Sequence, residues 1–216
     1  MLLAAARTVA PTRGHAHGRL RAETRALHAA LEQRLVMSAL ADREMYVRYL
    51  LMNLPCGSIE LGLVHAGVHR LLPDWDQRQR RAALAEDLAM LGVHSINYPS
   101  LATASDIGAM LGWCYVLEGS RLGARAILHV VAAAEDPRVR AATRFLRHGG
   151  DKDLWGSFKT ALSRIDNDAI AIARACAAAT TAFDCFMAAD CWSGASRSNP
   201  HRVISTSQRN ASRLCD

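Results

Sequence analysis

Apolar residues recur at helical spacing along most of the chain. Residues 20–35 read LRAETRALHAALEQRL, and the leucines at 20, 27, 31 and 35 predict one amphipathic helix over about 20–40. His28 lies beside two of these leucines, at the edge of the apolar face. The pattern therefore predicts an imidazole that is buried when this helix packs.

Segments with the same periodicity follow, with short breaks between them. They are predicted over about 43–72, 77–92, 105–134, 138–147 and 153–192. Pro55 interrupts the first of these, because proline lacks the amide N–H that a helix needs. Gly92 is expected to end the second segment, and Ser105 or Asp106 to cap the third. No stretch shows strand-like alternation of useful length, and no segment repeats.

The pattern as a whole predicts an all-α fold, a single-domain multi-helical bundle. A chain of 216 residues, half of them hydrophobic, is long enough to bury one substantial core. The domain is expected to cover residues 19–192. Residues 1–18 are expected to form a disordered arm, and the polar, aperiodic residues 193–216 a disordered tail.

Charge and cysteine usage exclude some functions. The net charge is +6, but residues 20–189 carry 19 basic and 18 acidic residues, so the excess lies at the two ends. No segment joins clustered basic residues with aromatic ones, so nucleic acid is not an expected partner. No run of 18 apolar residues occurs, so no membrane span is expected. The six cysteines form no C-x-x-C pair and no secretory signal is visible, which favours free thiols in a reducing cytoplasm.

The segment 108–131, GAMLGWCYVLEGSRLGARAILHVV, is apolar enough for a buried helix but contains four glycines. Each glycine inside a helix lowers its stability by about 0.5–1 kcal/mol relative to alanine. Two explanations are open: close packing against another helix, which composition alone favours, or a flat group lying against the backbone. Gly119 and Gly123 are one turn apart and leave the same strip bare. A planar macrocycle carrying iron fits between such a strip and a buried His28, which binds metal through a ring nitrogen.

At these same residues the chain resembles the heme oxygenase family. LRAETRALHAALE, residues 20–32, is similar to the proximal helix of the family, and YVLEGSRLGARAI, residues 115–127, to its distal helix. The resemblance extends over about 19–192 and is closest to the bacterial branch that supplies biliverdin to bacteriophytochromes. It implies a monooxygenase that binds heme as both substrate and cofactor. With O₂ and electrons from a ferredoxin or a flavoprotein reductase, such an enzyme opens the ring to biliverdin, CO and Fe²⁺.

The resemblance also implies roles for particular residues. His28 stands in the position of the axial iron ligand, and Glu32 is placed to accept a hydrogen bond from the other ring nitrogen. Gly119 and Gly123 would let the distal helix approach the heme closely. Three further residues are implied as partners of the heme carboxylates or as pocket wall: Arg21, Lys159 and Tyr115.

Two residues depart from the family pattern. Ser120 stands where many members carry an aspartate that orders distal water, although serine is usual in the bacteriophytochrome-linked branch. Ala124 replaces the second glycine of a final pair, and its methyl group is expected to narrow the pocket or tilt the heme. Both departures leave open a heme-binding carrier or sensor without turnover. A non-heme di-iron oxidase on the same fold is disfavoured, because no Glu-x-x-His pair occurs.

Overall fold

The computed structural model describes residues 14–94, 96, 98 and 106–195, without the side chains of 191–195. All regular structure among these residues is helical, which confirms the all-α prediction. The α-helices are α1 His15–Glu32, α2 Arg43–Met52, α3 Leu54–Ala66, α4 Arg81–Met90, α5 Ile107–Ala132, α6 Pro137–Ala141, α7 Arg144–Arg147, α8 Leu154–Leu162 and α9 Ala169–Ala195. Short 3₁₀ helices join several of them: η1 Met37–Ala41, η2 Val68–Arg70, η3 Trp75–Gln77 and η4 Ser163–Ile165.

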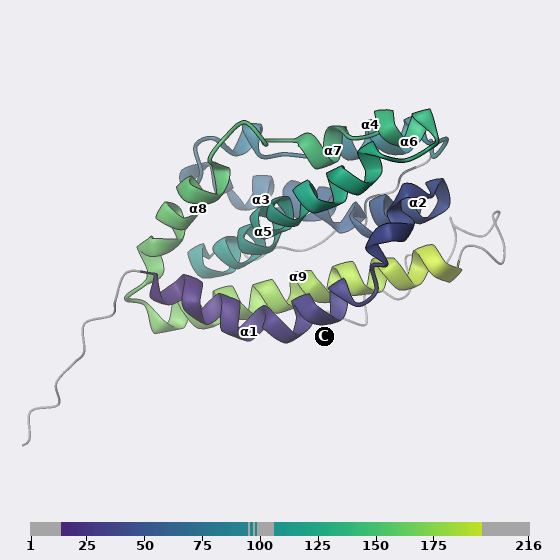
Figure 1. Cartoon of the computed structure of the whole chain (residues 1–216). Helices are drawn as coiled ribbons and strands as arrows, with labels where there is room; N and C mark the ends of the chain where they lie inside the picture. The colour runs from purple at the N-terminus through teal and green to yellow at the C-terminus, as the bar shows by residue number, and fades with distance from the viewer. Residues whose placement is uncertain (1–13, 95, 97, 99–105, 196–216) are drawn as a thin grey trace, which may run out of the picture.

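Helix α9 is the element on which α1 and α5 pack. It lies alongside α1 at the bottom of Figure 1, while α5 crosses above it and α2 covers its C-terminal end. Small residues let α5 approach closely, because Gly108 and Gly112 lie directly against the backbone of Ala171 and Ala175. Helices α1 and α5 make little direct contact with each other, so α9 sets the distance between them.

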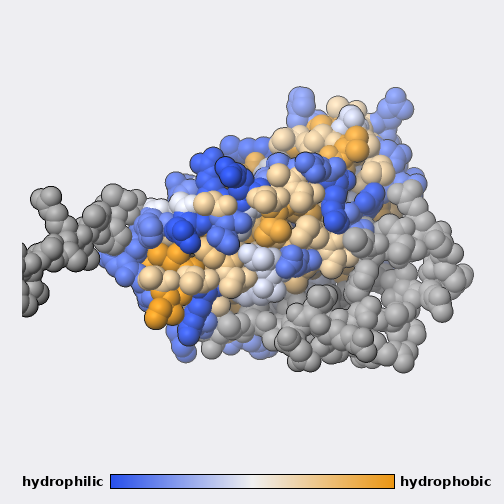
Figure 2. Space-filling model, turned by 90° about the horizontal axis from the view of Figure 1, so that it is seen from below, coloured by the Kyte–Doolittle hydropathy of each residue, from blue (hydrophilic) through white to orange (hydrophobic). Residues whose placement is uncertain are grey.

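The composition of α9 needs a separate account. By length and apolar content, Ala169–Asp190 could cross a membrane, with a mean hydropathy of 1.4. The same segment packs against α1, α2 and α5, and a central helix of this kind is expected to be apolar over much of its surface. From below, where α1 and α9 lie, hydrophilic residues are interspersed with apolar ones over the described surface (Figure 2). Since 44% of that apolar segment is buried, packing accounts for part of the apolar composition of α9.

Several predicted boundaries are confirmed and others are corrected. The chain breaks at Asn53, so that Pro55 lies in the first turn of α3, and Asp106 caps α5 by accepting a hydrogen bond from the Ala109 N–H. The predicted helix 138–147 is instead split into α6 and α7. The Asp87 carboxylate accepts hydrogen bonds from the first N–H groups of α7, and this contact lies 57 and 58 residues away in sequence. The pattern over 153–192 is likewise split into α8, η4 and α9.

Helix α1 begins within the segment predicted to be a disordered arm. Its first residue is His15, and Ala16 is completely buried. The Asp166 carboxylate, which follows η4, accepts hydrogen bonds from the N–H groups of Gly14 at 2.8 Å and Ala16 at 2.9 Å. Helix α9 also continues to Ala195, three residues past the predicted end. The rest of the predicted arm and tail, residues 1–13 and 196–216, lies outside the described residues.

We expect replacement of Asp166 by alanine to lower the free energy of unfolding by about 1–2 kcal/mol, because it leaves two N–H groups at the start of α1 without an acceptor. Urea unfolding followed by circular dichroism measures the change. Asp136→Ala is the matched control, since Asp136 caps the short, exposed α6 and should matter much less. Equal effects of the two substitutions would contradict the role given to Asp166.

Candidate functional site

Two helix faces meet at one end of the molecule. The ring of His17 on α1 lies edge-on to that of Tyr115 on α5, with 6.2 Å between the centroids. Helical periodicity then identifies which residues continue each face. The α1 face runs from His17 through Arg21 to His28. The α5 face runs from Tyr115 through Gly119, Leu122 and Gly123.

The four glycines of α5 divide into two pairs with different surroundings. A Cβ atom at Gly108 or Gly112 would lie only 2.3 or 2.1 Å from the carbonyl oxygens of Ala171 and Ala175. A Cβ atom at Gly119 or Gly123 would have no atom within 4 Å. Both explanations that the sequence left open therefore apply, one to each pair. The first pair allows helix packing, and the second leaves a bare strip on the α5 face.

The prediction that His28 is buried is wrong. Its side chain is 59% exposed, because α1 packs on α9 through Ala16, Leu20 and Thr24 and leaves His28 to one side. The ring lies edge-on to Phe183 of α9 at 6.2 Å. Nδ1 lies 3.4 Å from a carboxylate oxygen of Glu32, so the two residues lie close together without forming a hydrogen bond. Because Glu32 faces Nδ1, Nε2 is the ring nitrogen left for a metal.

Ser120 and Ala124 point away from the bare strip of α5. The Ser120 hydroxyl accepts a hydrogen bond from Arg80 Nη2 at 2.6 Å and donates one to the Leu117 carbonyl at 2.8 Å. Ala124 is 3% exposed, so its methyl group packs in the core. The expectation that this methyl group narrows the pocket is therefore corrected: one residue past Gly123, the helix has turned it by about 100° towards the interior.

Arg80 is a buried cation that sequence reasoning did not single out. Its side chain is completely enclosed, and its guanidinium lies over the Phe145 ring at 4.7 Å from the centroid. Besides Ser120, Nη2 donates to the Leu117 carbonyl at 3.0 Å, so Arg80 holds the backbone of α5 immediately before Gly119. Nothing in the local sequence distinguishes it from the neighbouring arginines, because its partners lie 37 to 40 residues away.

A buried ion network lies behind the same part of α5. Glu118 accepts hydrogen bonds or ion pairs from Arg78 at 3.2 Å and Arg121 at 3.0 Å, and Arg121 also contacts the His148 ring. Burial and then the neighbouring Arg80 guanidinium lower the pKa of Arg121 to about 10. Both arginines contact Oε2, and Oε1 has no hydrogen-bond partner among the described residues.

Two further glutamates, of the residue type that a di-iron centre uses, also have partners. Glu60 accepts hydrogen bonds from the N–H groups of Arg80 and Arg81, and Glu86 pairs with Arg144. Among the described residues, no group of three His, Cys, Asp or Glu side chains is placed to hold a metal ion. The structure thus gives the di-iron reading no support within that part of the chain.

His148 makes the stability of this network pH-dependent. Burial, followed by Arg121 and Arg80, lowers the pKa of its ring to about 4. Between about pH 6.5 and 4 the unfolded chain binds a proton that the folded chain does not, so stability falls as the pH is lowered through that window. We expect wild type to lose about 1 kcal/mol more than His148→Gln between pH 7 and 5, allowing for partial exposure. Identical losses in paired urea titrations would rule this out.

The predicted basic residues lie at the end where α1, α5 and α8 meet. Arg21 and Lys159 are exposed, and both act on the half-buried His17 ring as nearby positive charges. Tyr115 lies against His17 and 6.0 Å from Trp155 of α8. The structure therefore brings Arg21, Lys159 and Tyr115 to one end of the molecule and adds His17. The only sequence signal for His17 is its spacing, one turn before Arg21 and three turns before His28.

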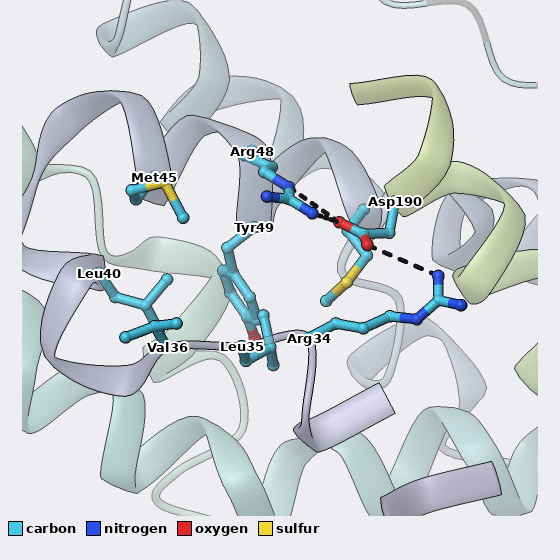
Figure 3. Close-up of a pocket in the computed structure, with 9 residues that line it drawn as sticks. Arg34, Leu35, Val36, Leu40, Met45, Arg48, Tyr49 and Asp190 are labelled. Carbon is cyan, nitrogen blue, oxygen red and sulfur yellow. Dashed lines mark hydrogen bonds and ion pairs between the residues drawn. The ribbon is translucent and has the colours of Figure 1, made fainter. Parts of the chain in front are cut away.

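A separate small pocket lies beyond the C-terminal end of α1. Figure 3 shows the Asp190 carboxylate of α9 between two arginines, 2.8 Å from Arg48 and 3.7 Å from Arg34. Arg34 also donates a hydrogen bond to the Met187 carbonyl. Apolar side chains form much of the remaining lining: Leu35, Val36, Leu40, Met45, Tyr49 and Met52. These contacts hold the chain just after α1 against α9 and so help to set the position of the helix that carries His28.

Comparison with known proteins agrees with this geometry. The family model described as heme oxygenase matches residues 68–189, which include all of α5 but not α1. A heme oxygenase of Xanthomonas campestris pv. campestris (strain 8004) is 33% identical over 109 residues, 50% of this chain and 66% of that protein. The alignment thus spans just under two thirds of that relative.

A solved structure shares the fold. The heme oxygenase of Neisseria meningitidis, crystallised with NO and CO bound, superposes with a TM-score of 0.68. The sequences are 20% identical, and the match covers 83% of this chain and 92% of the other. This likeness confirms the predicted architecture, and the family model covers more than half of the chain. The chain belongs to the heme oxygenase family.

Proposed function

We propose that this chain is a heme-degrading monooxygenase that binds heme as substrate and cofactor and releases biliverdin, CO and Fe²⁺. One observation carries the proposal: Gly119 and Gly123 leave a bare strip on α5, while the other glycines of the same helix are filled by packing. A flat ligand against the backbone explains why glycine occupies these two helix positions. Family membership identifies heme as the flat ligand.

The α1 face supplies the iron ligand. Nε2 of His28 makes no hydrogen bond within the described residues, and the Glu32 carboxylate near Nδ1 helps to orient the ring. Phe183 limits rotation of the ring from the α9 side. When bound, heme supplies both the iron that activates dioxygen and the macrocycle that is oxidised.

The α5 face supplies the distal side. Gly119 and Gly123 let the helix backbone approach the ligand closely. Ser120 Oγ points away from this strip and is held by Arg80 and the Leu117 carbonyl, so Ser120 positions the turn of α5 that carries Gly119. Arg80 thus fixes the orientation of that hydroxyl, and the buried network around Glu118 keeps bulk water away from the back of the helix.

Arg21 and Lys159 bind the carboxylates of the ligand, and Tyr115 lines the pocket between them. A carboxylate at a half-buried site needs a charged partner, and the two cations come from different helices at the same end of the molecule. The electrons come from a ferredoxin or a flavoprotein reductase, and biliverdin passes to a bacteriophytochrome in the cytoplasm. The resemblance to that bacterial branch, carried by residues 20–32 and 115–127 together, is the support for the bacteriophytochrome.

An absorbance time course tests the proposal. The purified chain is mixed with one equivalent of hemin and then given ascorbate, or ferredoxin with its reductase, in air. We expect a Soret band that decays into the broad red absorption of biliverdin. A stable Soret band under both reductants would instead identify a heme carrier or sensor. No Soret band at all would overturn heme binding.

A further inference from the structure

We propose that His17, Arg21 and Lys159 form a carboxylate-binding cluster in which His17 takes up a proton when the ligand's carboxylates bind. The inference rests on the proposed function and adds a regulatory property to the same site. Heme binding becomes coupled to pH through a histidine that is not the iron ligand. His17 lies three helical turns from His28, roughly 16 Å along α1, so the two rings act independently.

The position of His17 is set by three helices. Its ring lies edge-on to Tyr115 of α5, and edge-on to Trp155 of α8 at 5.7 Å between centroids. Trp155 in turn packs on the buried Phe158. The ring is half-buried, and it makes no hydrogen bond among the described residues. It is therefore held in place by aromatic contacts, with its nitrogens uncommitted.

The charges around His17 are positive. Arg21 lies one turn further along α1, and Lys159 lies one turn beyond Trp155 on α8. Burial first, and then Lys159 and Arg21, lower the pKa of the ring, and no carboxylate opposes them. The carboxylate of Asp166, near the start of α1, is already bound to the N–H groups of Gly14 and Ala16. Tyr115 is the titratable group that faces the ring from α5.

The two cations also lack a counter-charge of their own. Neither Arg21 nor Lys159 forms an ion pair or a side-chain hydrogen bond within the described part of the chain. Two exposed cations and a neutral imidazole on neighbouring helices match a ligand that carries two carboxylates, as heme does. Negative charge placed between them favours the protonated imidazole, so it reverses the effect of Arg21 and Lys159 on His17.

Proton linkage gives the proposal a quantitative form. The free ring is mostly neutral near pH 7, because its pKa lies below the ordinary value, and the carboxylates of the ligand increase its protonated fraction. Between the pKa values of the free and bound states, affinity falls by up to about tenfold for each unit of rising pH. Wild-type protein is then expected to take up to about one proton per ligand at pH 7.

Titration calorimetry at pH 7 tests this with the full chain and hemin. Repeating the titration in buffers of different ionisation enthalpy gives the number of protons bound. We compare wild type with His17→Gln, and with His17→Phe, which keeps a ring against Tyr115 and Trp155. Any proton change at His28 is common to all three proteins and cancels. Hemin dimethyl ester, which lacks the charged carboxylates, serves as the control ligand.

We expect wild type to take up at least roughly 0.3 proton more than either variant, and the difference to vanish with the dimethyl ester. Equal uptake by wild type and both variants would overturn the role of His17. An excess that persists with the ester would also overturn it, because His17 would then respond to the macrocycle. If wild type failed to bind hemin, the proposed function would fail too. Binding without excess uptake removes only the His17 proposal.

Discussion

Replacing His28 with alanine is expected to slow heme degradation by more than about 100-fold and to abolish the axial-histidine spectrum of the bound heme. Loss of a partner that only supports a metal ligand already lowers affinity or activity by about 10–100-fold, so loss of the ligand itself should exceed that range. The fold should survive, because the side chain is largely exposed. We expect the free energy of unfolding to change by less than about 0.5 kcal/mol.

The measurements are the optical spectrum of the hemin complex, the rate of biliverdin formation, and a urea titration. His129→Ala, an exposed histidine near the end of α5, is the matched control and should leave all three unchanged. Glu32→Ala should form biliverdin at a rate between those of wild type and His28→Ala, with heme still bound through histidine but more weakly. An unchanged His-ligated spectrum in His28→Ala would show that another residue holds the iron.

The sequence predicted those helix boundaries that depend on local chemistry. Pro55 and Asp106 act within a few residues of themselves, so their effects are readable from the chain alone. The boundaries that were missed depend on carboxylates that arrive from far away. Asp87 caps α7 and Asp166 caps the start of α1, at separations of more than 50 and about 150 residues. A periodic pattern does not show such contacts. The helix predicted over 138–147 was therefore too long, and the start predicted for α1 was too late.

The candidate site shows the same division. Two motifs on two helices led to the prediction that His28, Glu32 and the glycine strip form the site. The structure adds Arg80 and His17, whose neighbours come from other helices and have no signature at their own positions. The burial predicted for His28 was wrong for a related reason. Periodicity gives the apolar face of α1, but the stripe that contacts α9 runs through Ala16 and Leu20 rather than through the imidazole.

The two glycine pairs of α5 should respond to substitution in opposite ways. Gly112→Ala places a Cβ atom 2.1 Å from the Ala175 carbonyl oxygen, and neither backbone can move aside cheaply. We expect it to lower the free energy of unfolding by about 3 kcal/mol, at the upper end for overpacked sites. Gly123→Ala meets no atom within 4 Å, so we expect it to raise stability by up to about 1 kcal/mol through helix propensity.

The two glycine pairs are also expected to differ in their importance for hemin binding. Gly119→Leu covers the bare strip with a side chain while adding helix propensity, so the apoprotein should remain folded yet lose at least about tenfold in hemin affinity. Urea unfolding and hemin titration on the same samples give both quantities. A Gly119→Leu protein that is stable and still binds hemin as wild type does would mean that the ligand lies elsewhere. A variant that is stable but does not bind hemin would show that the ligand lies against these glycines. Helix packing alone gives no reason for binding to fail while the fold is intact.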